Sequence, residues 1–451
     1  MKSKEIAMMN KRWTRIAIGA LATVGMLAPL AACGGSGDGG DGSSASQSSG
    51  PVTIEWWGWD KGQKEQADLF NKSQSKIKVV YKQQASQDKA EQALVNAVKA
   101  GNAPDLSEIN MDSSISLLAD GTLQNANQYH PDLSNISEAA VKSFTVGDQL
   151  AVIPYKTSPG FMIVNEKTFR DAGVAIPTTW DEYIAAGKAL KAKNPNIKLT
   201  NLAGEDPAGL VLAAQQFGAQ WYQVKGDKWI IDINGPESKK AAKYYQEIVD
   251  NDMFSNKTFI EWDALMQYFQ SGDLATIGTS TWQLSAYQSN FQKSLGDWKA
   301  VPTPMESKDK RVSPTNAQGN GIPKGAKHPE EAARFAVWLA TNDKAIKLAA
   351  NAETGSGAFP AVKDPKQYVD ASLPDKLLSN RSEAVKVVED AVDIEAPYRT
   401  GANWSGMFKQ LQDQWAQFLA KKITADQMLD NVQSWTVNDL KQKGVNVESA
   451  N

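Results

Sequence analysis

The side chains able to carry out catalysis are few in this chain. Its 451 residues contain only two histidines, His130 and His328, and each is followed by proline, as is typical of loop or cap positions. A histidine-based triad, a two-histidine metal site and a Gly-Lys-Ser/Thr phosphate loop therefore find no support, and no cofactor is implied. The 51 Asp and Glu residues still allow a pair of catalytic carboxylates, which is what glycoside hydrolysis requires.

Aromatic rings beside polar side chains are the more informative pattern. Trp57, Trp59 and Asp60 follow a predicted strand, and Gly58 interrupts any core pattern there. A flat ring covers the C–H face of a pyranose, while carboxylate, amide and cationic side chains satisfy its hydroxyls. The combination recurs in later loops and predicts a sugar site. The predicted ligand contacts are Trp57, Trp59, Asp60, Gln63, Asn110, Asp112, Tyr155, Lys156, Glu205, Trp221, Trp282, Gln318, Asn320, Phe359, Arg399 and Trp404.

Strands and helices alternate where these loops begin. Val52, Ile54 and Trp56 alternate with polar residues, which predicts a strand, and further strands are expected at 77–81 and 104–109. A helix is predicted at 88–100, with Gly101 as its stop. This βαβα order indicates a parallel sheet covered by helices, and loops beyond the carboxyl ends of such strands line a ligand crevice.

Later helices have clear start signals. The segments Thr179–Glu182 and Thr424–Gln427 are capping boxes, and helices are expected at 236–250 and 329–340. The Met and aromatic stripes of the C-terminal helices fit core positions, so we assign them no ligand.

Composition favours an ordinary globular protein. Hydrophobic content is 41% and the formal net charge is −3, which argues against a nucleic-acid partner. Removing the predicted leader leaves roughly 420 residues, which exceeds what one hydrophobic core supports, so two domains are expected.

The single cysteine, Cys33, marks the end of a predicted leader. A basic segment precedes the apolar run 16–32, and Leu30-Ala-Ala-Cys33 is similar to the bacterial lipobox, in which the thiol is acylated before cleavage. We therefore predict a signal peptide over 1–32 and a lipidated, flexible Gly/Ser/Asp tether over 33–50. A plain signal peptide or a short membrane anchor is the alternative.

Several motifs, in order, resemble those of a known family. They are Val52-Thr-Ile-Glu-Trp-Trp, Ala103-Pro-Asp-Leu, Ile153-Pro-Tyr155, Val164-Asn165-Glu-Lys-Thr-Phe169, Pro177-Thr-Thr-Trp-Asp-Glu182 and the segment 322–335. The chain is identified by them as a member of the extracellular family 1 substrate-binding lipoproteins of bacterial ABC importers, which bind maltose and oligosaccharides. Val164 departs from the pattern, because tyrosine is usual there.

The resemblance implies an α/β, two-lobed periplasmic-binding-protein-like fold, with each lobe a mainly parallel sheet covered by helices. The N-lobe is expected over 51–155 plus 283–352, and the C-lobe over 160–280 plus 358–451. Three hinge segments are placed near 154–165, 278–282 and 355–359. The implied protein is a monomer on the outer face of the cytoplasmic membrane, which binds a carbohydrate between its lobes and delivers it to an ABC permease without catalysis.

Other functions stay open from the sequence alone. The same importer role could serve a peptide or an amine-type solute, since an aromatic cage also holds a quaternary amine by cation–π attraction. A lipid-anchored glycoside hydrolase and a surface adhesin are the remaining alternatives.

Overall fold

The alternating residues at the start of the chain form one strand of a six-stranded sheet. The computed structural model describes residues 50–307, 312–313 and 316–450, so Cys33, the predicted leader and residues 33–49 of the tether lie outside the described residues. The strand order is β15-β6-β14-β3-β1-β2. Their bounds are β1 Val52–Gly58, β2 Ile77–Gln83, β3 Leu106–Asn110, β6 Ile153–Thr157, β14 Ala317–Gly321 and β15 Phe359–Pro360.

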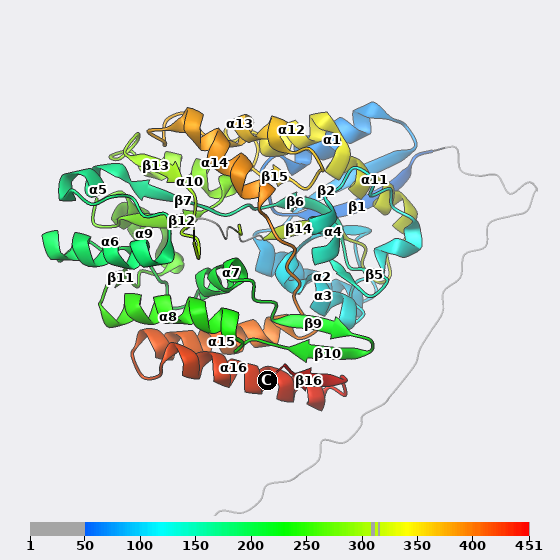
Figure 1. Cartoon of the computed structure of the whole chain (residues 1–451). Helices are drawn as coiled ribbons and strands as arrows, with labels where there is room; N and C mark the ends of the chain where they lie inside the picture. Colours follow the sequence, from blue (N-terminus) through cyan, green and yellow to red (C-terminus); the bar gives the residue numbers. More distant parts are fainter. Residues whose placement is uncertain (1–49, 308–311, 314–315, 451) are drawn as a thin grey trace, which may run out of the picture. The chain divides into compact units, whose positions relative to one another are not determined.

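Helices cover this first sheet on both sides (Figure 1). Helix α1 packs along β2, α2 contacts β3 and β1, and α11 crosses β6, β3 and β1. Apolar spacing explains the packing, because the residues of α2 that face the sheet, Ala90, Leu94 and Ala97, are all buried. The bounds are α1 Gln63–Ser73, α2 Gln87–Lys99, α3 Met111–Ala119, α4 Glu138–Ser143, α11 Pro329–Thr341 and α12 Asp343–Ala350.

A second sheet has the order β12-β7-β13. Its apolar residues pack with α9, α10, α13 and α14 into a separate core that contains Phe161, Phe269 and Trp298. The bounds are β7 Phe161–Asn165, β12 Thr276–Thr279, β13 Trp298–Val301, α5 Glu166–Ala172, α6 Trp180–Lys193, α9 Trp262–Phe269, α10 Thr281–Asn290, α13 Val369–Ser372 and α14 Arg381–Asp393.

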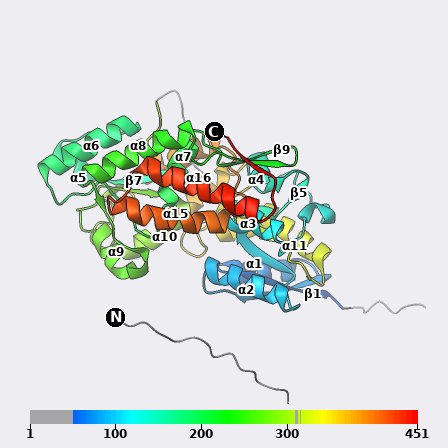
Figure 2. The same ribbon diagram turned by 90° about the horizontal axis from the view of Figure 1, so that it is seen from below.

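A helical layer completes the described chain, and Figure 2 shows its two C-terminal helices running side by side. Helix α8 packs against α7 and α16, and a small β16-β10-β9 sheet lies at the end of the layer. The bounds are α7 Ala208–Gln216, α8 Pro236–Asp250, α15 Trp404–Leu419, α16 Ala425–Gln442, β9 Tyr222–Lys225, β10 Lys228–Ile231 and β16 Val447–Ser449. Two short pairs remain, β4 Thr145–Val146 with β5 Gln149–Leu150, and β8 Thr200–Asn201 with β11 Phe254–Ser255.

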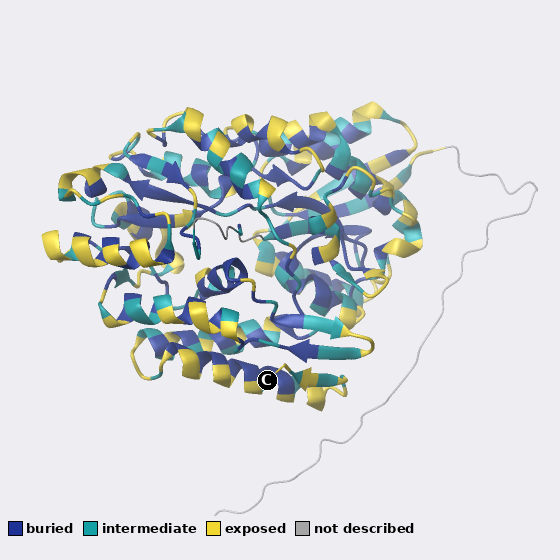
Figure 3. Ribbon diagram, in the orientation of Figure 1, coloured by how far each residue is buried: buried dark blue, intermediate teal, exposed yellow. Residues whose placement is uncertain are grey.

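The burial pattern follows the predicted alternation. Figure 3 shows buried residues concentrated along the strands and on the inner faces of the helices. In β1, Ile54 and Trp56 are fully buried, while Glu55 and Trp57 on the other face are half-buried. Both predicted capping boxes form, at Thr179 and at Thr424, and helix α2 ends just before Gly101, whose φ is 73°.

The predicted α/β fold class is confirmed, although not all strand pairs are parallel. Strand β1 is parallel to β2 and β3, but β14 is antiparallel to both of its neighbours, β3 and β6. In the second sheet, β7 is antiparallel to β12 and to β13. The long connections that separate β14 from β3 and β6 permit either strand direction, so the local alternation that predicts a strand does not fix how it pairs.

The chain changes sheets at places that differ partly from the expected ones. It leaves the first sheet between β6 and β7, within 154–165, and returns between β13 and β14. The expected passage at 278–282 is wrong, because β12 continues there into α10 beside the same sheet. Strand β13 pairs with β7, so residues 298–301 belong with the second sheet and not with the first lobe.

Candidate functional site

A pocket of about 350 Å³ opens beside the second sheet. Its walls come from the start of β7, the N-terminal ends of α6 and α10, the length of α7, and the segments that lead back toward β14. Buried rings line the inside, and two exposed rings lie where the pocket meets solvent. The lining residues used below are Trp180, Tyr245, Asp206, Ser280, Phe259 and Trp282.

Two buried polar atoms of this pocket lack partners. Trp180 is 6% exposed and Ser280 is 6% exposed, and neither Trp180 Nε1 nor Ser280 Oγ has a hydrogen-bond partner within the described part of the chain. A buried donor without a partner costs free energy comparable to a lost hydrogen bond. Both groups can therefore bond a polar ligand at little desolvation cost.

One carboxylate also lines the pocket. The Oδ1 atom of Asp206 accepts a hydrogen bond from the backbone N–H of Ala208 at 3.0 Å, at the start of α7. Burial raises the pKa of Asp206, and the neighbouring negative charge of Glu205 adds to the effect. The remaining carboxylate oxygen leaves Asp206 able to accept a further hydrogen bond from a hydroxyl.

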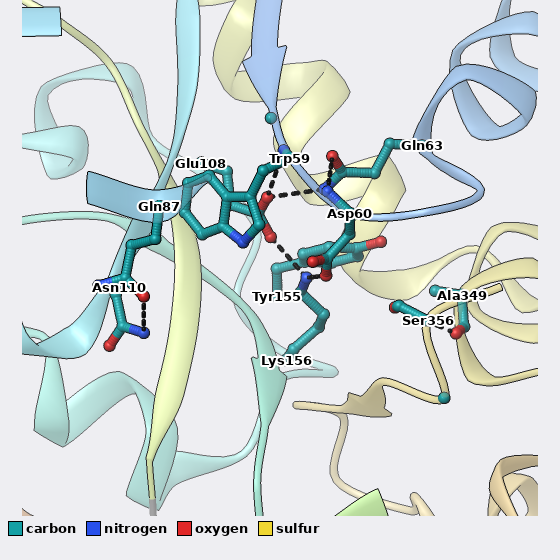
Figure 4. A network of polar contacts seen from close by, with 12 residues as sticks. Trp59, Asp60, Gln63, Gln87, Glu108, Asn110, Tyr155, Lys156, Ala349 and Ser356 are labelled. Carbon is teal, nitrogen blue, oxygen red and sulfur yellow. Dashed lines mark hydrogen bonds and ion pairs between the residues drawn. The ribbon is translucent and has the colours of Figure 1, made fainter. Parts of the chain in front are cut away.

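A network of charged side chains lies on the first sheet, around strands β3 and β6 and the loop after β1. Lys156 on β6 forms ion pairs with Asp60 and with Glu108 on β3, and Figure 4 shows the three side chains pointing toward one another. Gln63, at the start of α1, donates from Nε2 to Glu108 Oε2 at 2.8 Å and accepts at Oε1 from the backbone N–H of Asp60 at 3.0 Å. The backbone N–H of Trp59 also lies 3.4 Å from Glu108 Oε2.

The electrostatics of this network follow from its burial. Burial disfavours the ammonium of Lys156, but the Asp60 and Glu108 carboxylates outweigh burial and raise the pKa of Lys156. Burial raises the pKa of Glu108 despite the adjacent Lys156 ammonium. A cation between two carboxylates thus holds the loop after β1 in place.

Asp112 is linked electrostatically to a residue of the pocket. It lies in the first turn of α3, where the side chain of Asn110 caps the helix by accepting from the backbone N–H of Asp112 at 3.3 Å. Burial raises the pKa of Asp112 to about 6, and the charge of Asp206 contributes. Since Asp206 lines the pocket, the charge state of the pocket and that of Asp112 influence each other.

A family comparison decides what kind of protein this is. The family model described as "Bacterial extracellular solute-binding protein" matches residues 65–374. The chain belongs to this family. Within the described ranges, no helix has the length and apolar character needed to cross a membrane, and no group of three or more His, Cys, Asp or Glu side chains could hold a metal ion.

This solute-binding protein is similar to several known proteins. It is 24% identical over 193 residues to a lactose-binding protein of Rhizobium radiobacter, with 42% of this chain and 44% of the relative aligned, so the match spans less than half of that curated relative. A Bifidobacterium longum ABC-transporter binding protein, solved in complex with lacto-N-biose, matches with a TM-score of 0.75 at 19% identity, covering 89% of this chain and 100% of the other. An ABC-transporter-associated binding protein of Bifidobacterium animalis subsp. lactis, solved with β-1,6-galactobiose, gives 0.74 at 20% identity over 88% and 100% of the two chains. These structural matches show the fold of the solute-binding protein.

The pocket of the solute-binding protein contains only one of the predicted contact residues, Trp282. Others gather around the network at the first sheet: Trp59, Asp60, Gln63, Asn110, Asp112 and Lys156. Trp57 is half-buried and donates from Nε1 to Glu55 at 2.6 Å, and Gln318 lies on β14 opposite Asn110. The half-buried Glu205 bonds to the turn at 258–259, and Arg399 is half-buried in the loop before α15.

Five of the predicted contacts are buried among core residues in the described structure. Trp221 is fully buried and its Nε1 donates to Ser238 Oγ at 2.8 Å, and Trp404 packs among Trp221, Tyr222 and Tyr398. The other three are Tyr155, which donates to Gln66; Asn320, which accepts from Trp56; and Phe359, which belongs to the second core. A glycine close to a tryptophan in sequence therefore does not predict that the tryptophan ring lies in an exposed loop.

The sequence did not single out the pocket residues Trp180, Ser280 and Phe259. In the sequence, Trp180 stands inside a capping box, which predicts the start of a helix and gives no sign of a ligand contact. Ser280 precedes Trp282 in Gly278-Thr-Ser-Thr, so its position next to a predicted contact was an available signal. Phe259 gave no signal, because a single apolar residue before a helix predicts packing.

Proposed function

We propose that this protein captures a sugar or oligosaccharide in the pocket beside the second sheet and delivers it to an ABC permease. The observation that carries the proposal is the pair of unpartnered buried groups, Trp180 Nε1 and Ser280 Oγ, in a pocket walled by aromatic rings. A pyranose offers hydroxyls on its edge and C–H groups on its faces, which match both kinds of wall. The similarity to proteins named or solved with lactose, lacto-N-biose and β-1,6-galactobiose supports a carbohydrate ligand.

The first sheet supplies the opposite wall in this proposal. It would contribute the carboxylates of Asp60, which is paired with Lys156, and of Asp112, whose pKa responds to the charge of Asp206. Trp57 and Trp59 are half-buried and add ring faces there. We propose that a bound ligand contacts both sides and thereby stabilises a closed arrangement of two lobes, with the boundaries given above except that 298–301 belongs to the second lobe.

The predicted signal peptide and the location of the protein at the membrane belong to the same proposal. Cys33 carries the lipid, the Gly/Ser/Asp tether lifts the protein from the outer face of the cytoplasmic membrane, and the protein acts as a monomer without catalysis. A Cys33→Ala protein should bind ligand in solution and be lost to the culture medium. Retention of that variant in the membrane fraction would contradict the lipid anchor.

Thermal shift and calorimetry test the ligand. We expect at least one sugar of a panel containing lactose, lacto-N-biose, β-1,6-galactobiose and maltose to raise the melting temperature, because a ligand that binds only the native state stabilises it. Stabilisation by a peptide or a quaternary amine, with no response to any sugar, would keep the importer role and reject the carbohydrate. Release of reducing ends from the bound sugar over hours would instead favour the hydrolase.

Paired tryptophan variants test the pocket. Trp180→Phe removes the unpartnered donor and should weaken sugar binding about three- to tenfold, the range of a neutral hydrogen bond. Trp221→Phe is the matched control, since it removes a buried indole N–H that is already bonded to Ser238 outside the pocket. The control should lower stability and leave affinity unchanged, and equal losses of affinity in both variants would place the site elsewhere.

A further inference from the structure

The pocket beside the second sheet carries charge of one sign. Among the described residues that line it, Asp206 is the one charged side chain, and none is Lys, Arg or His. The other polar side chains of the lining are hydroxyl, amide and indole groups, which are neutral. A ligand that enters the pocket therefore meets a negative charge and no positive charge from these residues.

The charge of Asp206 has little to balance it. The carboxylate accepts a hydrogen bond from the backbone N–H of Ala208, but no cation of the described residues acts on its pKa. Burial raises the pKa of Asp206, and the negative charge of Glu205 raises it further. A buried charge without an opposite charge costs free energy, so a cation placed beside Asp206 would be favoured.

The neighbouring carboxylate is already bonded within the protein. Glu205 Oε1 accepts hydrogen bonds from Thr258 Oγ1 at 2.6 Å and from the backbone N–H of Phe259 at 2.7 Å. Burial disfavours the ionised form of Glu205, but its hydrogen bonds outweigh burial and lower its pKa. Glu205, predicted as a sugar contact, thus holds the turn at 258–259, and Asp206 is the carboxylate that remains for a ligand.

Asp112 adds a second negative charge without a cation. Burial raises the pKa of Asp112 to about 6, the charge of Asp206 contributes, and no cation of the described residues opposes them. The first sheet has the opposite arrangement, because Lys156 pairs there with both Asp60 and Glu108 (Figure 4). The described chain thus supplies a cation to one pair of carboxylates and none to the other pair.

We propose that the sugar captured in this pocket carries a free amino group, and that its ammonium binds the Asp206 carboxylate. This inference rests on the proposed sugar-binding function. An ammonium donates a charge-assisted hydrogen bond, which is roughly twice as strong as a bond from a neutral hydroxyl. Trp180 Nε1 and Ser280 Oγ remain available for the ring hydroxyls. Uronic acids and sugar phosphates should bind poorly, because they bring a like charge to Asp206.

Titration calorimetry with matched sugars near neutral pH tests the proposal. One series is lactose, lactosamine with its free amino group, and N-acetyllactosamine. The other is cellobiose, the β-1,4-linked glucosamine dimer, and its diacetylated form. In at least one series the amino sugar should bind about tenfold more tightly than the neutral parent and the acetylated sugar. Acetylation keeps the nitrogen and removes the charge, so the comparison isolates the ammonium.

Asp206→Asn and Asp181→Asn are matched variants. Asp181 directly follows Trp180, is exposed and lies outside the pocket lining, where its Oδ1 accepts a hydrogen bond from the Tyr244 hydroxyl at 2.9 Å. Asp206→Asn should reduce the ratio of amino-sugar to neutral-sugar affinity toward one, whatever it does to the neutral sugar alone. Asp181→Asn removes the same charge and should leave the ratio unchanged. An equal fall of the ratio in both variants would overturn the contact with Asp206.

The inference and the proposed function fail in different ways. Binding of any neutral sugar, with no preference for the ammonium in either series, would overturn the inference and keep the proposed function. Failure of every sugar to bind, amino sugars included, would remove both. A response to a quaternary amine alone would also remove both, because sugar hydroxyls would then play no part in recognition.

Discussion

The polar network at the first sheet and the pocket at the second sheet differ in whether their buried polar groups have hydrogen-bond partners. In the network, Lys156 satisfies two carboxylates and Gln63 bonds to both Glu108 and the loop after β1. In the pocket, Trp180 Nε1 and Ser280 Oγ remain without partners among the described residues. The polar groups of the network are therefore largely bonded to one another, whereas the pocket has two polar groups that can still form hydrogen bonds with a ligand.

This difference assigns a structural role to the network at the first sheet and a ligand-binding role to the pocket at the second sheet. Residues of the network should mainly affect stability, and residues of the pocket should mainly affect affinity. A sugar contact at the first sheet would then be made by groups at the edge of the network, such as Asp60 and Trp59, whose positions the buried ion pairs determine.

The largest expected effect comes from removing the cation of the network. Lys156→Met leaves Asp60 and Glu108 as uncompensated neighbours in a buried place, and should lower the free energy of unfolding by ~3–5 kcal/mol. Urea denaturation measures this loss. Adding Glu108→Gln to the variant should restore part of the stability, because one of the two carboxylates is then neutral.

The control for this prediction is Lys64→Met, which breaks an exposed ion pair with Asp68 and should leave the denaturation midpoint unchanged. If Lys156→Met were as mild as the control, the network would not be structural and the comparison with the pocket would fail.

Alanine substitutions at two glycines, one in the first sheet and one in the pocket, should differ in their effect on stability. A methyl group on Gly319, in β14, would lie 2.3 Å from Val152 Cγ2 and 2.7 Å from the carbonyl of Ile153, so Gly319→Ala should cost roughly 1–3 kcal/mol of stability. On Gly278, which lines the pocket, the same methyl group meets nothing within 4 Å. Gly278→Ala should keep the melting temperature and weaken ligand binding, and a destabilised Gly278→Ala protein would contradict this assignment.

The smallest expected effect is a pH dependence that links the two regions. Burial raises the pKa of Asp112 to about 6, above its value in the unfolded chain. The folded protein then binds more protons between pH 4 and 6, so this group makes stability fall as pH rises through that window and stay level above it. In ligand-free protein, Asp112→Asn should raise the melting temperature by a few degrees at pH 7.5 and by nothing near pH 4.

A second variant tests whether the charge of Asp206 affects the pKa of Asp112. Asp206→Asn removes the charge that contributes to the shift, so the pH window of Asp112 should move downward. An unchanged window in the Asp206→Asn protein would show that α3 and the pocket are not coupled in solution.

Sequence patterns located the elements better than the site. The capping boxes at Thr179 and Thr424 and the alternation in β1 depend on neighbouring residues, so local physics was sufficient to predict them. The place of β14 between β3 and β6 and the pairing of β13 with β7 depend on contacts between distant segments, which periodicity does not encode.

The same limit applies to single rings. Trp221 and Trp282 each follow a glycine by a few residues, yet one is fully buried and the other is 54% exposed. Their surroundings come from different elements, Ser238 on α8 for Trp221 and the pocket for Trp282. Residue type gave the chemistry of the site, and only the tertiary arrangement selects which rings take part.

The antiparallel strand β14 also bears on the order in which the chain can fold. It joins β1, β2 and β3 on one side to β6 on the other, yet it lies at 317–321, far along the chain from both. A chain emerging from its N-terminus therefore has an incomplete first sheet until β14 and then β15 at 359–360 are available, while β7, β12 and β13 are already present. Such non-local pairing slows folding, so the second sheet should gain protection from hydrogen exchange before the first.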